Sequence, residues 1–367
     1  MDHAACELEL ACAHAGAPLS VDRGALTRMR QGLVRAYAAA APGAPFEVRE
    51  LRWGALPDDE VEVVVEACGL CHSDLAMWRD DWSRKRFPLV AGHEIVGRVV
   101  ALGREARGLE LGQRVGIGWF RKSCLHCPAC RRGDLQHCVA LQRLLVDGTG
   151  GFAERVRCHW AWTLPLPDTL DPRSAGSLFC AGITAYAPIT RHVHPSHRVG
   201  VVGIGGIGHL AVQLLRAWGC EVLAVVRDEA QAADALRLGA HRAVLSGSSA
   251  EELRRAGGLD LLLVATGAPL PWPALLGMLA PQGRLHLLAM SCESIPLVPA
   301  ELIPRALTVS SSPLGRPDEM QQLLMFCARH GIAPQVETLP MRRLDEAMAM
   351  LEQGNARYRL MLIPDLD

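Results

Sequence analysis

The hydrophobic and polar positions of the chain follow one period before about residue 172 and another after it. Between residues 32 and 117, short segments alternate apolar and polar positions and are separated by turns containing glycine or proline. This alternation predicts strands at 33–37, 46–51, 61–67, 95–103 and 113–117. Short, closely spaced strands of this kind indicate a β-rich, partly open barrel.

After residue 172, apolar strands alternate with helical segments. Strands are expected at 198–202, 221–226, 259–265, 283–289 and 307–310, and helices at 174–186, 209–218, 230–238 and 318–330. A last helix and strand are expected within 344–363. Alternation of this type predicts a parallel sheet with helices on both faces, which is the doubly wound α/β architecture.

Length and charge narrow the class of protein. The 367 residues are enough for about two domains. The formal net charge of −1 favours neither nucleic acid nor an anionic membrane, and no apolar run approaches the roughly 20 residues that span a bilayer. The N-terminus is acidic and has no apolar signal core. We therefore expect a globular protein of the cytoplasm.

Four cysteines lie within one short segment, at Cys124, Cys127, Cys130 and Cys138. Cys-x-x-Cys steps allow thiolates to converge on one tetrahedral ion, and Zn²⁺ takes four sulfurs in closed structural sites. Disulfides are the alternative, but without a secretory signal such close steps favour a metal. The segment is locally basic, yet no base-reading helix follows it, so nucleic-acid binding is not expected. A structural zinc lobe at 121–139 is the interpretation.

A glycine-rich loop, Gly203-Ile204-Gly205-Gly206-Ile207-Gly208, follows the predicted strand 198–202 and opens the predicted helix 209–218. In this context the first glycine makes a tight turn, the second admits a pyrophosphate and the third packs the helix on the strand. The phosphate would lie at the helix N-terminus, where free N–H groups attract anions. The loop therefore predicts a dinucleotide site.

The end of the next predicted strand bears on the choice of dinucleotide. NAD sites usually have an acid there that binds the ribose hydroxyls. This chain has Val226 followed by Arg227, and an arginine can pair with a 2′-phosphate. Asp228 lies slightly later and keeps NAD open. NADP(H) is favoured over NAD(H).

Three further residues are candidate ligands of a second, reactive metal. Cys71 follows a predicted strand, His93 precedes another, and Cys180 lies near the first helix of the second half. Two thiolates and one imidazole would leave a fourth position open for substrate, as in catalytic zinc sites. Each residue alone could equally be a buried cysteine or a hydrogen-bonded core histidine.

Taken together, the motifs resemble the zinc-dependent medium-chain alcohol dehydrogenases, in particular the branch of cinnamyl alcohol dehydrogenases and bacterial aldehyde reductases. The resemblance extends from about residue 32 to the end of the chain. It is carried by Cys71-His72-Ser73-Asp74-Leu75, Gly92-His93-Glu94, the cysteine lobe, Leu178-Phe179-Cys180-Ala181-Gly182-Ile183-Thr184 and the glycine-rich loop. It implies a GroES-like catalytic domain joined to a Rossmann domain.

The resemblance also implies roles for individual residues. Catalytic zinc would be held by Cys71, His93 and Cys180, with Glu94 able to approach the ion. Asp74 would orient the ligand histidine, a role that is also expected on physical grounds. The other implied roles are proton transfer by Ser73, proximity to the cofactor pyrophosphate for His72, and a position facing the nicotinamide for Thr184. Two zinc ions per chain and a homodimer follow from the same resemblance.

One position departs from the family pattern. Many relatives carry a histidine that completes a proton relay where this chain has Ala76. Interconversion of an alcohol and an aldehyde is the expected reaction. NADPH-dependent reduction of an iminium or conjugated carbonyl substrate is the alternative, and a non-catalytic NADP-binding protein is a less favoured one. Four aromatic residues could line an apolar substrate pocket or only pack, namely Trp78, Trp82, Trp119 and Phe120.

The predicted domains follow from these assignments. Residues 1–31 form an extension, 32–181 the catalytic domain with its zinc lobe, 182–325 the dinucleotide-binding domain, and 326–367 a return to the catalytic domain.

Overall fold

The computed structural model describes residues 32–83, 87–291 and 294–366, and the predicted extension 1–31 lies outside them. The chain divides into two compact units. The first unit comprises the chain up to Cys180, Arg316–Met325 and Gln335–Asp367, and the second comprises Ala181–Gly315 and Phe326–Pro334. This division differs from the expected bounds at residue 181 and over 316–334, because helix α13 (Pro317–His330) is shared between the units.

The first unit consists mainly of strands. These are β1 (Leu33–Ala39), β2 (Phe46–Arg52), β3 (Glu60–Leu70), β4 (Glu94–Leu102), β5 (Arg114–Ile117), β6 (Phe120–Lys122), β7 (Gln142–Arg143), β8 (Arg155–His159), β9 (Thr163–Pro165), β16 (Val336–Pro340) and β17 (Arg359–Ile363). Its helices are α3 (His72–Arg79), α4 (Pro128–Arg131), α5 (Leu144–Asp147), α6 (Pro172–Ala175) and α14 (Leu344–Glu352), with 3-10 turns η1 (Leu135–His137), η2 (Trp160–Trp162), η3 (Gly176–Phe179) and η5 (Met341–Arg343).

Strand β3 organises this unit. The main sheet has the order β16-β17-β3-β4-β5-β9, and β8 also pairs with β3. One edge of β3 pairs with β4, while the opposite edge pairs with β8 near its start and with β17 near its end, all antiparallel. Alternate valines of β3, Val61, Val63 and Val65, are buried in the core. The end of β3 leads directly into α3, which carries the first predicted zinc ligand at its N-cap.

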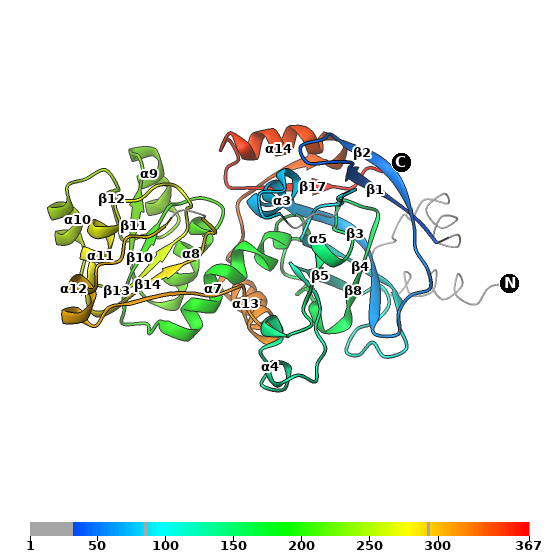
Figure 1. Ribbon diagram of the computed structural model, residues 1–367, viewed down its shortest axis with the longest axis horizontal. Coiled ribbons are helices and arrows are strands. Elements are labelled where there is room, and N and C mark those ends of the chain that lie inside the picture. The colour runs from blue at the N-terminus through cyan, green and yellow to red at the C-terminus, as the bar shows by residue number, and fades with distance from the viewer. Residues whose placement is uncertain (1–31, 84–86, 292–293, 367) are drawn as a thin grey trace. The chain divides into compact units, whose positions relative to one another are not determined.

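The second unit alternates strands and helices (Figure 1). Its strands are β10 (Arg198–Val202), β11 (Glu221–Val226), β12 (Arg242–Leu245), β13 (Leu259–Val264), β14 (Leu279–Leu287) and β15 (Thr308–Ser311). Its helices are α7 (Ala181–His192), α8 (Gly208–Trp218), α9 (Glu229–Arg237), α10 (Ala250–Ala256), α11 (Trp272–Gly277) and α12 (Pro299–Leu302), with the turn η4 (Ile303–Arg305).

The six strands of the second unit form one parallel sheet in the order β12-β11-β10-β13-β14-β15. The order reverses between β10 and β13, and ligands of doubly wound sheets bind at such a point, beyond the carboxyl ends of the strands. Local sequence sets the ends of the helices: α8 stops at Gly219 with φ 103°, and α9 and α10 begin at the capping residues Asp228 and Ser249.

The predicted α/β architecture is confirmed, and the strands expected at 198–202 and 221–226 have those bounds. The single helix predicted at 174–186 is wrong, because η3 ends at Phe179 and α7 begins only at Ala181. Helix α3 and the short strands β12 and β16 were missed, since each has few residues and no clear period. Of the helices in the described part of the chain, none has both the length and the apolar character needed to cross a bilayer.

Candidate active site and metal centres

Cys71 is held at the junction of β3 and α3. It is the N-cap residue of the helix, and the Asp74 carboxylate reaches back and accepts the Cys71 backbone N–H at 2.9 Å. Both residues are buried. This local turn directs the thiol of Cys71 to one side of the strand end and also fixes the carboxylate of Asp74.

His93 is positioned by the same carboxylate. Asp74 Oδ1 lies 3.0 Å from His93 Nδ1 and accepts the Gly92 backbone N–H at 2.8 Å. The side chains of His93 and Asp74 have no exposed area. In the tautomer whose Nδ1–H donates to the carboxylate, Nε2 keeps the lone pair that a metal ligand needs. These contacts of Asp74 with His93 and Gly92 are the ones that the predicted orienting role requires.

Cys180 completes the set at the break between η3 and α7. Its backbone has φ −126° and ψ −76°, which interrupts the helical path and turns its side chain toward the other two residues. Cys180 Sγ lies 3.8 Å from Cys71 Sγ and 3.2 Å from His93 Nε2. The helix break that the sequence interpretation missed is thus the feature that places Cys180 beside Cys71 and His93.

The donor atoms of these three residues and of Glu94 lie within 4.8 Å of one another. A tetrahedral Zn²⁺ with sulfurs at 2.3 Å separates two of them by about 3.8 Å, which matches the sulfur–sulfur distance here. The hydrogen bond between the thiols lowers the pKa of Cys71 well below its ordinary value and raises that of Cys180. The two sulfurs thus share a proton that a cation would replace. The residues fit zinc.

Glu94 is paired with a residue to which the sequence interpretation gave no role. Its Oε1 binds the Arg359 guanidinium from β17, and both side chains are buried. Arg359 Nε also donates to Ser177 Oγ at 3.4 Å. Glu94 Oε2 is buried with no hydrogen-bond partner among the described residues, and a Cβ on Gly69 would lie 2.1 Å from it. The pairing could have been suspected from the arginine at the start of the otherwise apolar strand 359–363, because a buried cation requires an acidic partner.

Two of the four predicted pocket aromatics lie near this site. Trp119 meets the His93 ring edge to face, with the ring centres 5.0 Å apart, and Trp82 packs on Trp119 in the same manner at 6.0 Å. The other two have different neighbours: Trp78 stacks on Phe46, and Phe120 packs on Trp162.

The remaining predicted residues of α3 lie beside the ligand turn. His72 is exposed, and Ser73 and Ala76 are half-buried. Among the described residues, Ser73 makes no hydrogen bond to Cys71, His93 or Cys180. Thr184 is buried on α7 in the second unit.

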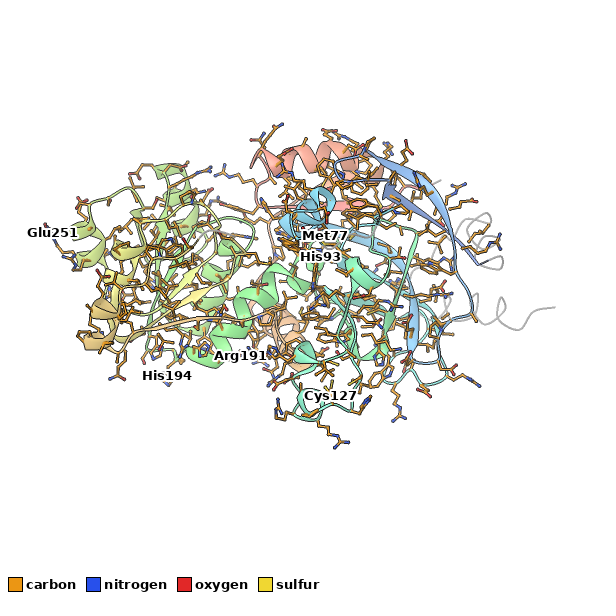
Figure 2. The ribbon with its side chains drawn as sticks, in the orientation of Figure 1. Met77, His93, Cys127, Arg191, His194 and Glu251 are labelled. Carbon is orange, nitrogen blue, oxygen red and sulfur yellow. The ribbon has the colours of Figure 1, made fainter. Side chains whose placement is uncertain are left out.

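The cysteine lobe forms a second ligand set in the first unit, and Figure 2 shows Cys127 well separated from His93. The four sulfurs lie within 4.8 Å of one another, and Cys124 Sγ is 4.0 Å from Cys130 Sγ. Backbone N–H groups of Cys130 and Val139 lower the pKa of Cys127 to about 6, so its thiolate form is favoured. Cys138 Sγ accepts the Cys124 and Ala140 N–H groups at 3.2 and 3.3 Å. This set also fits zinc.

The glycine-rich loop connects β10 to α8. Gly203 has φ +85°, and a Cβ on Gly208 would lie 1.9 Å from the Gly203 carbonyl oxygen, so both positions require glycine. A Cβ on Gly205 would meet no described atom within 4 Å. The space beside Gly205, next to the N-terminus of α8, is therefore open to a phosphate group.

Three candidate contacts for the cofactor ribose lie at or just after the end of β11, and they differ in exposure and in hydrogen bonding. Val226 is buried, whereas the Arg227 side chain is 74% exposed. Asp228 caps α9: its Oδ1 accepts the Gln231 N–H at 2.8 Å, and its Oδ2 accepts Arg227 Nε at 2.9 Å. Both hydrogen bonds lower the pKa of Asp228, and the bond to the Gln231 N–H has the larger effect. Its carboxylate is thus already engaged.

Comparison with known proteins gives consistent matches. Residues 57–168 match the family described as alcohol dehydrogenase GroES-like domain, and residues 206–329 match the zinc-binding dehydrogenase family. Aldehyde reductase AdhA of Synechocystis sp. is 39% identical over 332 residues, covering 90% of this chain and 98% of that protein. NADP-dependent alcohol dehydrogenase C 1 of Mycolicibacterium smegmatis is 32% identical over 343 residues, covering 90% and 97%. A cinnamyl alcohol dehydrogenase structure from Sorghum bicolor has a TM-score of 0.85 at 27% identity, covering 90% and 97%.

Proposed function

Because this chain belongs to the zinc-dependent medium-chain alcohol dehydrogenases, we propose that it transfers hydride between NAD(P)H and an aldehyde or primary alcohol. Its relatives carry the names alcohol dehydrogenase and aldehyde reductase, and the chain is accordingly an oxidoreductase acting on CH–OH groups. The observation that carries the proposal is the convergence of Cys71, His93 and Cys180 from three separate segments.

These three residues would hold the catalytic zinc, and Glu94 could approach it. When bound, zinc supplies Lewis acidity to the substrate oxygen, and the cofactor supplies or accepts hydride. Asp74 keeps the His93 Nε2 lone pair directed at the metal position through its bond to Nδ1. Ser73, next to the ligand turn, would receive the alcohol proton. Trp119 and Trp82 would exclude water with their apolar rings.

We propose a second, structural zinc in the lobe, held by Cys124, Cys127, Cys130 and Cys138. Four sulfurs leave no position for substrate, so this ion would only stabilise the lobe. The contrast between the two sets supports a total of two zinc ions per chain.

We propose NADP(H) as the preferred cofactor. Arg227 is exposed and follows the end of β11, where a 2′-phosphate would lie, and the Asp228 carboxylate is occupied by the helix cap. The relative from Mycolicibacterium smegmatis carries NADP-dependent in its name. Residues 203–208 would hold the pyrophosphate, and Thr184 would face the nicotinamide.

The test is turnover of the zinc-loaded protein with a panel of aliphatic and aromatic aldehydes, using NADPH and NADH in parallel. We expect reduction with both classes of aldehyde and a higher kcat/KM with NADPH. Absence of turnover with every aldehyde, at a measured two zinc ions per chain, would refute the reductase assignment. A higher kcat/KM with NADH would refute only the cofactor assignment.

A second candidate activity follows from Ala76, whose methyl group cannot carry a proton. An NADPH-dependent reductase of an iminium or conjugated carbonyl compound would not need a relay through that position. Parallel assays with an α,β-unsaturated aldehyde, followed by product analysis, separate reduction of the carbonyl from reduction of the double bond.

We also propose a homodimer formed through the second unit. Strand β15 lies at the end of the parallel sheet, and Met290 and Ile303, in the segment before it, have exposed fractions of 74% and 75%. Unpaired strand edges with exposed apolar neighbours favour association. Light scattering should show a dimer that Ile303→Glu dissociates and that Met325→Glu, an exposed residue of the first unit, does not.

A further inference from the structure

A cavity of about 240 Å³ lies in the first unit at the start of β3. Its lining includes Arg52, Trp53, Glu60, Arg121 and Arg157. Glu60 is the first residue of β3, whereas the zinc-ligand turn follows its last residue, and 11 residues of strand span roughly 35 Å. The cavity is therefore separate from the Cys71, His93 and Cys180 set, and none of the four lobe cysteines lines it.

Glu60, which lines the cavity, has one carboxylate oxygen without a donor in the described part of the chain. Glu60 is 2% exposed, and its Oε1 accepts Arg121 Nη2 at 2.6 Å. Its Oε2 is buried and has no hydrogen-bond partner among the described residues. An unpartnered buried oxygen of a charged group is costly, and natural proteins rarely retain one without a ligand or water. Glu60 thus offers an acceptor to a hydrogen-bond donor that enters the cavity.

Two of the three arginines that line the cavity are fixed in place. Arg121 is bound by Glu60 and donates to Gln142 Oε1 at 2.6 Å. Arg157 donates to Glu62 Oε2 at 2.8 Å and lies over the Trp53 ring with its guanidinium 4.6 Å from the ring centre. Fixed guanidinium groups present donors with little further loss of conformational freedom.

The charges do not balance. Glu62 is shared by Arg157 and Arg155, while Glu60 pairs with Arg121 alone. Arg52 lines the cavity and has no acidic partner among the described residues. Three guanidinium groups and one carboxylate line the cavity, and the Glu62 carboxylate behind Arg157 is shared with Arg155, so an excess of two positive charges remains. This excess excludes a cationic ligand and matches a dianion.

We propose that the cavity binds a small phosphate compound that carries both anionic oxygens and an O–H group. Arg52 and the surplus positive charge would bind the anionic oxygens, and Glu60 Oε2 would accept the O–H. Hydrogen phosphate has both features, as does a phosphate monoester with a hydroxyl group. Sulfate has the same charge but no O–H group. It would therefore leave the Glu60 oxygen without a donor and place a second negative charge beside it.

The binding test uses calorimetry at neutral pH on the zinc-loaded, full-length protein with saturating NADPH, so that the phosphate positions of the cofactor site are occupied. The probes are inorganic phosphate, glycerol 3-phosphate and sulfate. We expect saturable phosphate or glycerol 3-phosphate binding that is at least about tenfold tighter than sulfate binding, the effect of one charge-assisted hydrogen bond. Tighter binding of glycerol 3-phosphate assigns the site to an organic ester, and otherwise the inorganic ion is its ligand.

Variants locate the binding in this cavity. Arg52→Ala should weaken phosphate binding about tenfold or more. Arg49→Ala removes the same charge from the same strand at a position that does not line the cavity, and it should have little effect. Glu60→Gln keeps the side-chain size and turns an acceptor into a possible donor, so it should reduce the preference for phosphate over sulfate.

Three results would overturn the proposal. They are the absence of saturable binding of both phosphate probes, equal weakening by Arg52→Ala and Arg49→Ala, and sulfate binding as tight as phosphate binding in the unsubstituted protein. Since Arg52 is exposed, its substitution tests the site without disturbing the core.

Discussion

The two cysteine-containing ligand sets differ in how the chain assembles them. The lobe draws its four sulfurs from one short segment, Cys124–Cys138, in which turns and backbone N–H groups arrange them locally. The other set joins Cys71 to Cys180 across 109 positions and requires β3, β4 and the break before α7 to meet. A local segment can close around an ion by itself, whereas a set with an open position has to be built by the fold.

The two sets also differ in what surrounds the ligands. In the lobe, backbone amides donate to the sulfurs, so this support depends on the turns and not on particular side chains. At the second set, the supports are side chains: Asp74 binds His93, and Arg359 binds Glu94. Substitutions in the lobe should therefore lower the stability of the protein, whereas substitutions at the second set should lower its turnover.

The largest expected effect is on turnover in Cys180→Ser. A serine hydroxyl is a poor ligand beside Cys71 and His93, and the loss of Lewis acidity removes several kcal/mol of transition-state stabilisation, at least about a thousandfold in kcat. Steady-state assays and metal analysis measure this. Cys220→Ser, a buried thiol of the second unit, is the control and should retain activity. Retained activity in Cys180→Ser would show that the open set is not catalytic.

Cys127→Ser should act first on stability. Binding of structural zinc contributes about 10 kcal/mol or more in small zinc domains, so losing one sulfur should lower the free energy of unfolding by several kcal/mol. Calorimetry and zinc content per chain provide the measurement. His137→Ala, an exposed change in the same lobe, should alter neither. An unchanged zinc content and unfolding midpoint in Cys127→Ser would contradict the closed-site interpretation.

Asp74→Asn should weaken zinc binding at the open set alone. An amide cannot accept all three hydrogen bonds that the carboxylate receives, and loss of such a partner typically costs about 10–100-fold in metal affinity. Competition with a chelator should release one zinc ion more readily, while the lobe ion is retained. Asp80→Asn, at the other end of α3, serves as the control. Equal release of both ions would mean that Asp74 acts on overall stability.

The smallest expected change is in the pH profile of Ala76→His. A histidine on α3 introduces a group that titrates near its ordinary pKa of about 6.5, so the alcohol-oxidation rate should gain a dependence on pH in that range. The comparison is with Ala76→Asn, which is polar and does not titrate there. If both variants keep the original profile, the proton leaves by a path that does not involve position 76.

The sequence was sufficient where function depends on local geometry. The glycine roles in residues 203–208 follow from a strand-to-helix turn, and the structure places Gly203 and Gly208 in positions that only glycine can occupy. The convergence of the four lobe sulfurs was equally predictable, because the four cysteines are neighbours in the chain. The hydrogen bond from the Cys71 backbone N–H to Asp74 is local in the same way, because it spans three residues.

The sequence was insufficient where partners are far apart. The pairing of Glu94 with Arg359 spans 265 positions and depends on β17 lying against β3. The orphan oxygen of Glu60 likewise has no sequence signature, since an acid at the start of a strand is ordinarily solvated. Local turns follow from short-range sterics and hydrogen bonds, which the sequence alone determines. Convergence of distant side chains depends on strand order, register and the break at Cys180, so only the tertiary structure decided it.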